Sequence, residues 1–127
     1  MPKRILVGTD GSDTAAIAVR RAAGLARDTG AELLVFTAYQ RPKGQASAKR
    51  IVSPVVREAM KTVKAVRAVI KEGNPADAIL DAAEEEDADL IVVGNKGMHG
   101  HTRFFLGNVP NRVSHNARCN VLIVRTT

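Results

Sequence analysis

The sequence has few of the residues that form disulfides or stack on nucleic-acid bases. It contains one cysteine, Cys119, which cannot form a disulfide within the chain, and we therefore expect a cytoplasmic protein. Tryptophan is absent, and the chain has only three phenylalanines and one tyrosine. Because single-stranded nucleic acids are held largely by stacking of bases on aromatic side chains, we expect no nucleic-acid partner. The formal net charge of +6 does not change this expectation, because Lys and Arg are scattered along the whole sequence.

Long hydrophobic runs are also missing. The apolar stretches Ile91–Val93 and Val121–Val124 are far shorter than the ~20 residues that cross a bilayer, so we expect no membrane span and no membrane partner. The strand-like Ile5–Val7 follows the first four residues directly, and we expect no signal peptide. Neither Gly-x4-Gly-Lys-Ser/Thr nor Gly-x-Gly-x2-Gly occurs, which excludes the P-loop and dinucleotide fingerprints.

The 127 residues, 45% of them hydrophobic, predict a single domain over residues 1–127 with a buried core. In the first third of the chain, apolar residues at strand spacing alternate with apolar residues at helix spacing. We predict a strand over Arg4–Thr9, a turn with helix-capping residues at Asp10–Asp13, a helix that ends at Gly30, and a second strand over Glu32–Tyr39.

The rest of the chain continues the alternation. We predict a polar loop over Gln40–Lys49, a short helix over Val55–Met60, a strand over Thr62–Ile70, a helix that begins at Asn74-Pro75, a strand over Leu90–Val93, a glycine-containing connection over Gly94–Gly107, a helix over Val109–Ala117 and a strand over Val121–Val124. Unbroken apolar strands separated by helices predict the α/β class, with an open five-stranded parallel sheet covered by helices on both faces.

The long connection after the fourth strand has glycines in an unusual pattern, Gly94-x2-Gly97-x9-Gly107, followed by Asn108. Glycine lets backbone N–H groups converge on phosphate oxygens, and the start of the last helix favours an anion. Lys96, His99, His101 and Arg103 add positive charge in the same segment. A flexible loop whose glycines only permit turns would give the same spacing.

This pattern resembles the ATP-binding signature of the universal stress protein family. Three further segments are similar to that family: Ile5–Ser12 to its opening strand and turn, Ala88–Gly94 to its fourth strand, and Cys119–Val124 to its last strand. The resemblance implies a Rossmann-like sheet of the adenine nucleotide alpha hydrolase type, in the order 3-2-1-4-5. It also implies that a nucleotide binds at the carboxyl edge of the sheet, where the winding direction reverses.

By this resemblance, Asp10 and the end of the second strand near Ala38 hold the ribose and adenine, whereas the glycine segment holds the phosphates. A carboxylate at Asp10 repels phosphates but accepts hydrogen bonds from ribose hydroxyls or shares a metal ion. This chemistry agrees with a nucleotide whose ribose lies at Asp10 and whose phosphates point toward the glycine segment. Asp10 could instead serve only as a turn residue. The expected nucleotide-binding residues are Gly8, Thr9, Asp10, Ala38, Gly94, Asn95, Lys96, Gly97, His99, Arg103, Gly107, Asn108 and Val109.

Two features depart from the family pattern. Asn108 stands where nucleotide-binding members usually carry Ser or Thr, and an Asn amide can cap the helix, donate to a phosphate, or do both. The stretch between Tyr39 and Thr62 is shorter than the family's usual loop and long second helix, so either this member has a stub helix or the chain lacks part of a loop.

We expect ATP as the ligand, with or without Mg²⁺, and a regulatory role in stress response without catalytic residues, with slow hydrolysis at most. Cyclic AMP or AMP is an alternative ligand, and a dimeric module that binds no nucleotide is an alternative function. An apolar strand at the edge of a sheet favours pairing with a second copy, so we expect a homodimer through Val121–Val124. The spacing of His99, His101, His115 and Cys119 matches no common zinc pattern.

Overall fold

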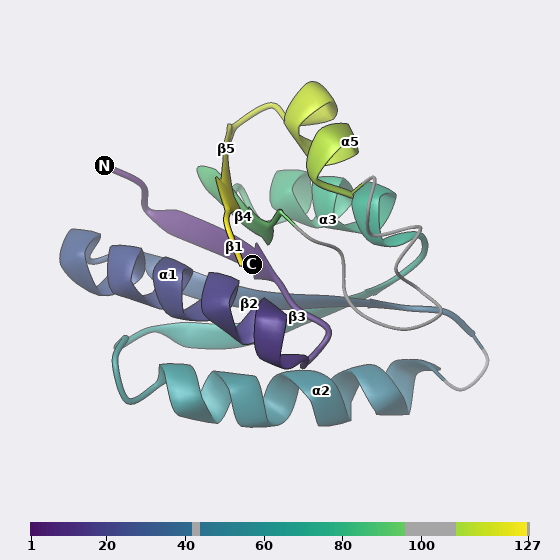
Figure 1. Cartoon of the computed structure of the whole chain (residues 1–127), viewed down its shortest axis with the longest axis horizontal. Coiled ribbons are helices and arrows are strands. Elements are labelled where there is room, and N and C mark those ends of the chain that lie inside the picture. Colours follow the sequence, from purple (N-terminus) through teal and green to yellow (C-terminus); the bar gives the residue numbers. More distant parts are fainter. Residues whose placement is uncertain (42–43, 96–108, 127) are drawn as a thin grey trace.

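The computed structural model describes residues 1–41, 44–95 and 109–126. In these residues, strands and helices alternate along the chain (Figure 1). The elements are β1 (Arg4–Gly8), α1 (Asp13–Thr29), β2 (Glu32–Tyr39), α2 (Gly44–Ala59), β3 (Val66–Glu72), α3 (Pro75–Glu85), β4 (Leu90–Gly94), α5 (Val109–Asn116) and β5 (Asn120–Val124). The alternation confirms the predicted α/β class.

The strands form one parallel sheet in the order β3-β2-β1-β4-β5, as predicted. The central strand β1 pairs with β2 on one side and with β4 on the other. Its residues Ile5, Leu6 and Val7 have no exposed surface. A strand that is buried on both faces has no solvent side for polar residues, which explains why β1 reads as a continuous apolar run.

Helices cover both faces of the sheet. Figure 1 shows α1 and α2 below the sheet and α3 and α5 above it. The first pair packs on one buried cluster with Ile5, Val7, Leu33 and Val35, and the second pair packs on another with Leu6, Leu34, Phe36 and Ile91. Alternate residues of β1 and β2 therefore belong to opposite cores.

Helices α1 and α3 begin at the capping residues that the sequence predicted, and α1 ends at the predicted glycine. Ser12 accepts the N–H of Ala15 at the start of α1, and Gly30, with φ 74°, ends that helix in the left-handed conformation. Asn74 caps α3 by accepting the N–H of Ala76, and Pro75 occupies the first helical position. None of the helices in the described ranges is long and apolar enough to cross a membrane.

Helix α2 is much longer than predicted. The expected loop over Gln40–Lys49 is wrong from Gly44 onward, and the expected short helix at Val55–Met60 is only the last part of the 16-residue α2. Pro54 lies inside the helix. The helix forms because Ala48, Val52 and Ala59 follow helical spacing and are buried, Val52 and Ala59 in the cluster that includes Leu33 and Val35 of β2. This burial outweighs the hydrogen bond that Pro54 cannot donate.

The third strand is also displaced from its predicted position. It covers Val66–Glu72 and not Thr62–Ile70, because Val63 is buried beside α2 in the turn before the strand. β-branched residues at 62–66 favour a strand locally, but the pairing with β2 begins at Val66 opposite Leu33. The boundaries of the other strands differ from prediction by one residue at most, and the last helix ends at Asn116, one residue early.

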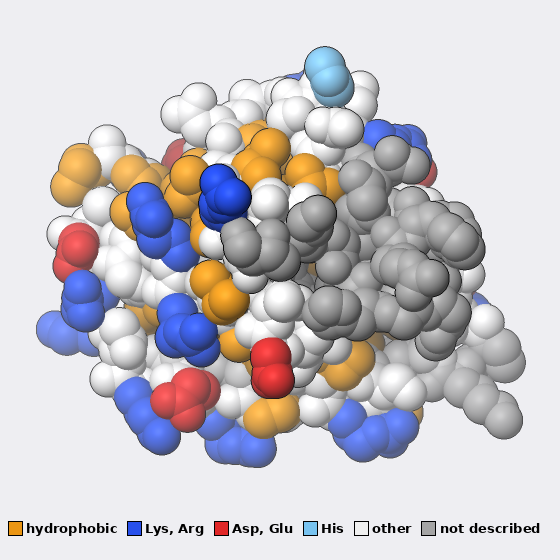
Figure 2. All heavy atoms as spheres, in the orientation of Figure 1, with side chains coloured by type: hydrophobic (Ala, Val, Ile, Leu, Met, Phe, Trp, Pro, Cys, Tyr) orange, Lys and Arg blue, Asp and Glu red, His pale blue; other side chains and the backbone are white. Residues whose placement is uncertain are grey.

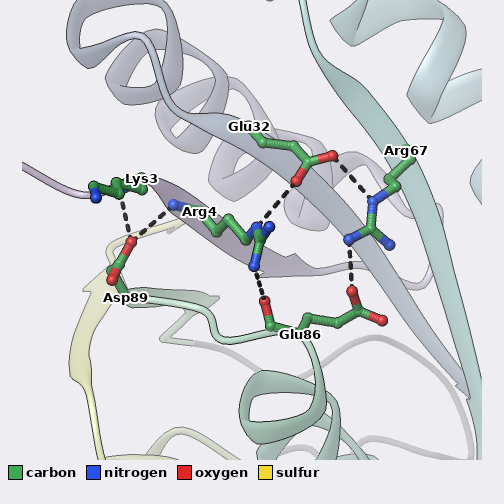
Figure 3. A network of polar contacts seen from close by, with 6 residues as sticks. All are labelled: Lys3, Arg4, Glu32, Arg67, Glu86 and Asp89. Atoms are coloured by element: carbon green, nitrogen blue, oxygen red, sulfur yellow. Dashed lines mark hydrogen bonds and ion pairs between the residues drawn. The ribbon is translucent and has the colours of Figure 1, made fainter.

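A polar network fixes the amino edge of the sheet (Figure 3). Arg67 on β3 contacts Glu32 at 3.0 Å and Glu86 at 2.5 Å, and Arg4 contacts the same Glu32 at 3.4 Å. The Asp89 carboxylate accepts the backbone N–H groups of Lys3 and Arg4 at 2.6 and 2.9 Å. These backbone hydrogen bonds lower the pKa of Asp89, and the hydrogen bond from Arg67 lowers the pKa of Glu86. The network joins the starts of β1, β2 and β3 to the end of α3.

Candidate functional site

The candidate site is the carboxyl edge of the sheet, where β1 and β4 separate. Their pairing ends at Val7 opposite Val92, although β4 continues to Gly94. Beyond that point β1 stays with β2, because Gly8 is still paired with Phe36. Strand β4 stays with β5, since Gly94 is opposite Val124. The strands on the two sides of the reversal in strand order therefore part at their carboxyl ends, which is where open parallel sheets bind ligands.

Buried hydroxyl groups hold the end of β1. The Thr9 N–H donates to the Phe36 carbonyl at 2.9 Å, and the Thr9 hydroxyl accepts the N–H of Gly11 at 3.0 Å. The hydroxyl of Thr37 donates to the Thr9 carbonyl. Thr9 is 4% exposed and Thr37 is 5% exposed. The structure therefore assigns Thr9 a positioning role: its polar groups are used to shape the turn that presents Asp10.

Asp10 combines a structural contact with an unused acceptor. Its Oδ1 accepts the N–H of Ser12 at 2.9 Å, which closes the turn before α1. This confirms the turn role that the sequence left open. The second carboxylate oxygen has no hydrogen bond within the part of the chain that the structure describes, and the residue is half-buried. Asp10 can therefore keep its turn and still accept a hydrogen bond from a ligand hydroxyl.

Gly8 and Ala38 lie on the α3 side of the sheet. A Cβ at Gly8 would be 3.3 Å from Cδ1 of Ile79 on α3, so close helix packing explains the glycine. Ala38 packs against the same buried cluster and is half-buried near the end of β2. Both residues therefore pack on the α3 side of the sheet and contribute no polar side-chain group to the site.

Asn95 is anchored to the end of the chain beyond β5. Its N–H donates to the carbonyl of Val124 at 2.8 Å, and its Oδ1 accepts both the N–H and the hydroxyl of Thr126, at 2.8 and 3.2 Å. The side-chain oxygen is thus fully used, and the Nδ2 group is the donor that remains. The structure fixes the residue at which the glycine segment begins.

The other half of the predicted site lies outside the described residues. These predicted residues are Lys96, Gly97, His99, Arg103, Gly107 and Asn108. Val109, the first described residue after them, begins α5 and is 8% exposed. Because α5 connects two parallel strands, its first residue lies at the same edge of the sheet as Asp10 and Asn95. Within the described ranges, no group of three or more His, Cys, Asp or Glu side chains could hold a metal ion.

Sequence reasoning missed two polar residues at this edge. Thr37 stands in an apolar strand, and Thr126 follows the last strand, where it is 8% exposed. A hydroxyl among buried residues near the carboxyl end of a strand is a signal that could have identified Thr37, because buried hydroxyls require a partner. Nothing in the local sequence marks Thr126, since its partner Asn95 is 31 positions away.

Comparisons with known proteins agree with this geometry. The model of the family described as the universal stress protein family matches residues 1–125. A universal stress protein of Thermus aquaticus is 39% identical over 137 residues, which cover 98% of this chain and 100% of the relative. One from Mycobacterium tuberculosis strain H37Rv is 36% identical over 143 residues, which cover 98% and 97%.

Two solved structures are similar over nearly the whole chain. A universal stress protein in complex with cAMP has a TM-score of 0.84 and 35% identity, and the match covers 99% of this chain and 98% of the other. A universal stress protein from Archaeoglobus fulgidus in complex with dAMP has a TM-score of 0.74 and 29% identity, with 96% and 97% covered. Fold, family model and relatives all lead to one conclusion: the chain belongs to the universal stress protein family.

Proposed function

We propose that this protein binds an adenine nucleotide at the carboxyl edge of the sheet, between β1 and β4, and acts as a regulatory stress-response protein. The observation that carries the proposal is the separation of these strands beside an Asp10 carboxylate, one oxygen of which has no hydrogen bond to any described residue. The complexes of similar proteins with cAMP and dAMP support an adenine nucleotide as the ligand class.

In this proposal Asp10 binds the ribose and the surface formed by Gly8 and Ala38 lies along the base. Residues from Gly94 onward take the phosphates, which keeps the phosphates away from the Asp10 charge. Asn95 contributes a donor through Nδ2, because its oxygen is already bonded to Thr126. ATP is the nucleotide that we expect first, and Mg²⁺ would bind through the phosphates. AMP offers the same ribose and base groups, whereas cAMP can offer Asp10 only its 2′ hydroxyl, because its 3′ oxygen belongs to the cyclic phosphate.

The regulatory part of the proposal rests on what fast phosphoryl transfer requires. Such enzymes combine a metal clamp, a positioned nucleophile and a charge-stabilising arginine. Among the described residues at this edge, Asp10 is the only carboxylate that we place beside the ligand. We therefore infer a sensor that hydrolyses ATP slowly if at all, and a measurement of phosphate release with and without Mg²⁺ tests this inference.

The main experiment is titration of the nucleotide-free protein with ATP, AMP, dAMP and cAMP by calorimetry. We expect a Kd of about 1–100 µM for at least one of them. Asp10→Asn should weaken that binding by about 10–100-fold, because Asn can still accept the Ser12 N–H but presents a donor to the ribose. Asp13→Asn is the matched control, since Asp13 lies on α1 and is exposed.

Two results would contradict the proposal. In the first, the purified protein releases no nucleotide on denaturation, and the titrations detect no binding with a Kd below about 1 mM. A Kd of 1 mM corresponds to a binding free energy of only ~4 kcal/mol, which we take as the weakest meaningful affinity. The other is an Asp10→Asn variant that is folded and binds as tightly as the unchanged protein. The first result would leave the alternative of a dimeric module that binds no nucleotide.

We also propose a homodimer that forms through β5. This strand is at one edge of the sheet, and Ile123 on it is 41% exposed. An unpaired strand edge with an exposed apolar side chain favours pairing with the same strand of a second copy.

A further inference from the structure

The two helical layers of the molecule carry opposite charge. Residues 13–29 and 44–64, which include α1 and α2, have a net charge of +5. Residues 75–95 and 109–118, which include α3 and α5, have a net charge of −5. The cations of the first layer are Arg20, Arg21, Arg27, Lys49, Arg50, Arg57, Lys61 and Lys64, and its anions are Asp13, Asp28 and Glu58.

The acidic layer is largely neutralised within the molecule. Asp77 pairs with Arg112 at 2.6 Å, Glu84 with Arg118 at 3.6 Å and Glu85 with Lys71 at 2.9 Å. Glu86 and Asp89 belong to the network at the amino edge. Charges that are already paired attract an external partner weakly, so the α3 and α5 layer does not offer an acidic surface for the basic layer of a second copy.

The basic layer is mostly unpaired. Two of its cations, Arg27 and Lys61, have ion pairs, with Asp28 at 3.0 Å and Glu58 at 3.2 Å. The other six have no ion pair within the ranges that the structure describes, and all six are exposed: Arg20, Arg21, Lys49, Arg50, Arg57 and Lys64. The surplus positive charge of the described structure is therefore concentrated on one layer and is accessible.

The two helices give the layer a broad surface. Helices α1 and α2 lie side by side on one face of the sheet (Figure 1), and with 17 and 16 residues each extends about 25 Å. Figure 2 shows blue side chains over the lower and left parts of the molecule, where these helices lie, with red side chains among them and further blue side chains higher up. The sequences of α1 and α2 contain no Phe, Tyr or Trp that could stack on a nucleic-acid base.

We propose that the face formed by α1 and α2 binds the anionic headgroups of a phospholipid surface, which revises the expectation of no membrane partner that we drew from the absence of long hydrophobic runs. A plane of phosphates can contact cations along both helices at once, whereas the curved surface of a duplex reaches only part of so broad a layer. The opposite layer, whose charges are largely paired, offers little attraction to the same surface, which orients the molecule with α1 and α2 toward the lipid. The proposal uses none of the residues that we place in the nucleotide site, and it does not depend on the proposed function.

The experiment is co-sedimentation of the full chain with vesicles of phosphatidylcholine, with and without about 30% phosphatidylglycerol. We expect binding to the anionic vesicles at about 0.1 M salt and its loss at about 1 M, where the Debye length falls from ~10 to ~3 Å. The double variant Arg20→Gln with Arg57→Gln should bind about 10-fold or more weakly, because each surface cation contributes to lipid attraction. Arg20→Lys with Arg57→Lys should bind like the unchanged protein.

The matched control is Arg112→Gln with Arg118→Gln, which removes the same charge from the opposite layer. We expect this control to change binding by less than about 2-fold, because these residues face away from the lipid. Equal losses in the two double variants would overturn the proposal, since only net charge would then matter. So would the absence of binding to anionic vesicles, or tighter binding to duplex DNA than to vesicles at the same salt concentration.

Discussion

Asn95 and Thr126 are joined by two hydrogen bonds, from the Thr126 N–H at 2.8 Å and from its hydroxyl at 3.2 Å, both to Oδ1 of Asn95. The contact connects the residue that begins the glycine segment to the residue that lies two positions beyond β5. It thereby links the proposed nucleotide site to the strand through which we propose that two copies pair.

Asn95→Ala should lower the free energy of unfolding by about 1–2 kcal/mol, because it leaves the N–H of the buried Thr126 without an acceptor. Asn95→Asp keeps an acceptor for the Thr126 N–H and should lower the free energy of unfolding by less. Hydrogen exchange measured by NMR checks the cause: the Thr126 amide should lose protection in the alanine variant and keep it in the aspartate variant. Unchanged protection in Asn95→Ala would show that the contact is not formed in solution.

Gly24→Ala should stabilise the protein by about 0.5–1 kcal/mol, because glycine is unfavourable inside a helix. Gly24 lies within α1, and apart from its chain neighbours and the backbone of its own helix, no atom of the described residues is within 4 Å of the position that its Cβ would take. Thermal unfolding should show a rise in Tm of about 3–5 °C. Gly30→Ala is the matched control and should lower the Tm, since Gly30 has a φ of 74°. A lower Tm for Gly24→Ala would refute the packing argument.

Asp89→Ala should destabilise the protein near neutral pH and progressively less in acid. The lowered pKa of Asp89 means that its contribution to stability is complete above the pKa of the unfolded state, ~3.9, and is lost as the pH falls through the lower folded value. Denaturant unfolding at about pH 7 and about pH 2.5 measures the difference between variant and unchanged protein. Asp81→Ala, an exposed change on α3, is the control. A difference that grows toward low pH would contradict the assignment.

Ile123→Lys should convert the proposed dimer to a monomer. The substitution places a charge on an edge strand, where it opposes pairing with another copy. Size-exclusion chromatography with light scattering should give a mass near 27 kDa for the unchanged protein, about twice the 13.6 kDa of one chain. Arg41→Glu, an exposed change near the opposite edge strand, should leave the mass unchanged. A monomeric unchanged protein would refute the β5 interface.

Much of the fold could be predicted because local patterns and tertiary packing agree. The apolar runs of β1 and β4, the cap at Ser12 and the stop at Gly30 each depend on neighbours within a few positions. The prediction failed at α2, which we expected only over Val55–Met60. Burial of Val52 in the cluster that includes Leu33 and Val35 of β2 favours a helix that begins earlier, and that burial requires a strand that is distant in the sequence.

The candidate site also has features that local sequence predicts and features that depend on distant residues. The sequence predicted that the turn after β1 and the glycine segment after β4 meet at one edge, because parallel strands align their carboxyl ends. It did not predict that Asp10 keeps only one oxygen for a ligand, or that Thr37 and Thr126 fix the two turns. Hydrogen-bond partners such as Asn95 and Thr126 become neighbours only when the sheet has formed.

By itself, the sequence determined the element order, because this order depends on apolar periodicity and capping residues. The resemblance carried by its short motifs implied the family and the strand order of the sheet. Tertiary structure alone decided how the charge is distributed. Lys and Arg are scattered along the chain, and nothing local distinguishes Arg20 from Arg112. Folding places the first in an unpaired basic layer on α1 and α2 and the second beside Asp77. Electrostatic attraction depends on distance in space, and that distance is set only when the helices pack on the sheet.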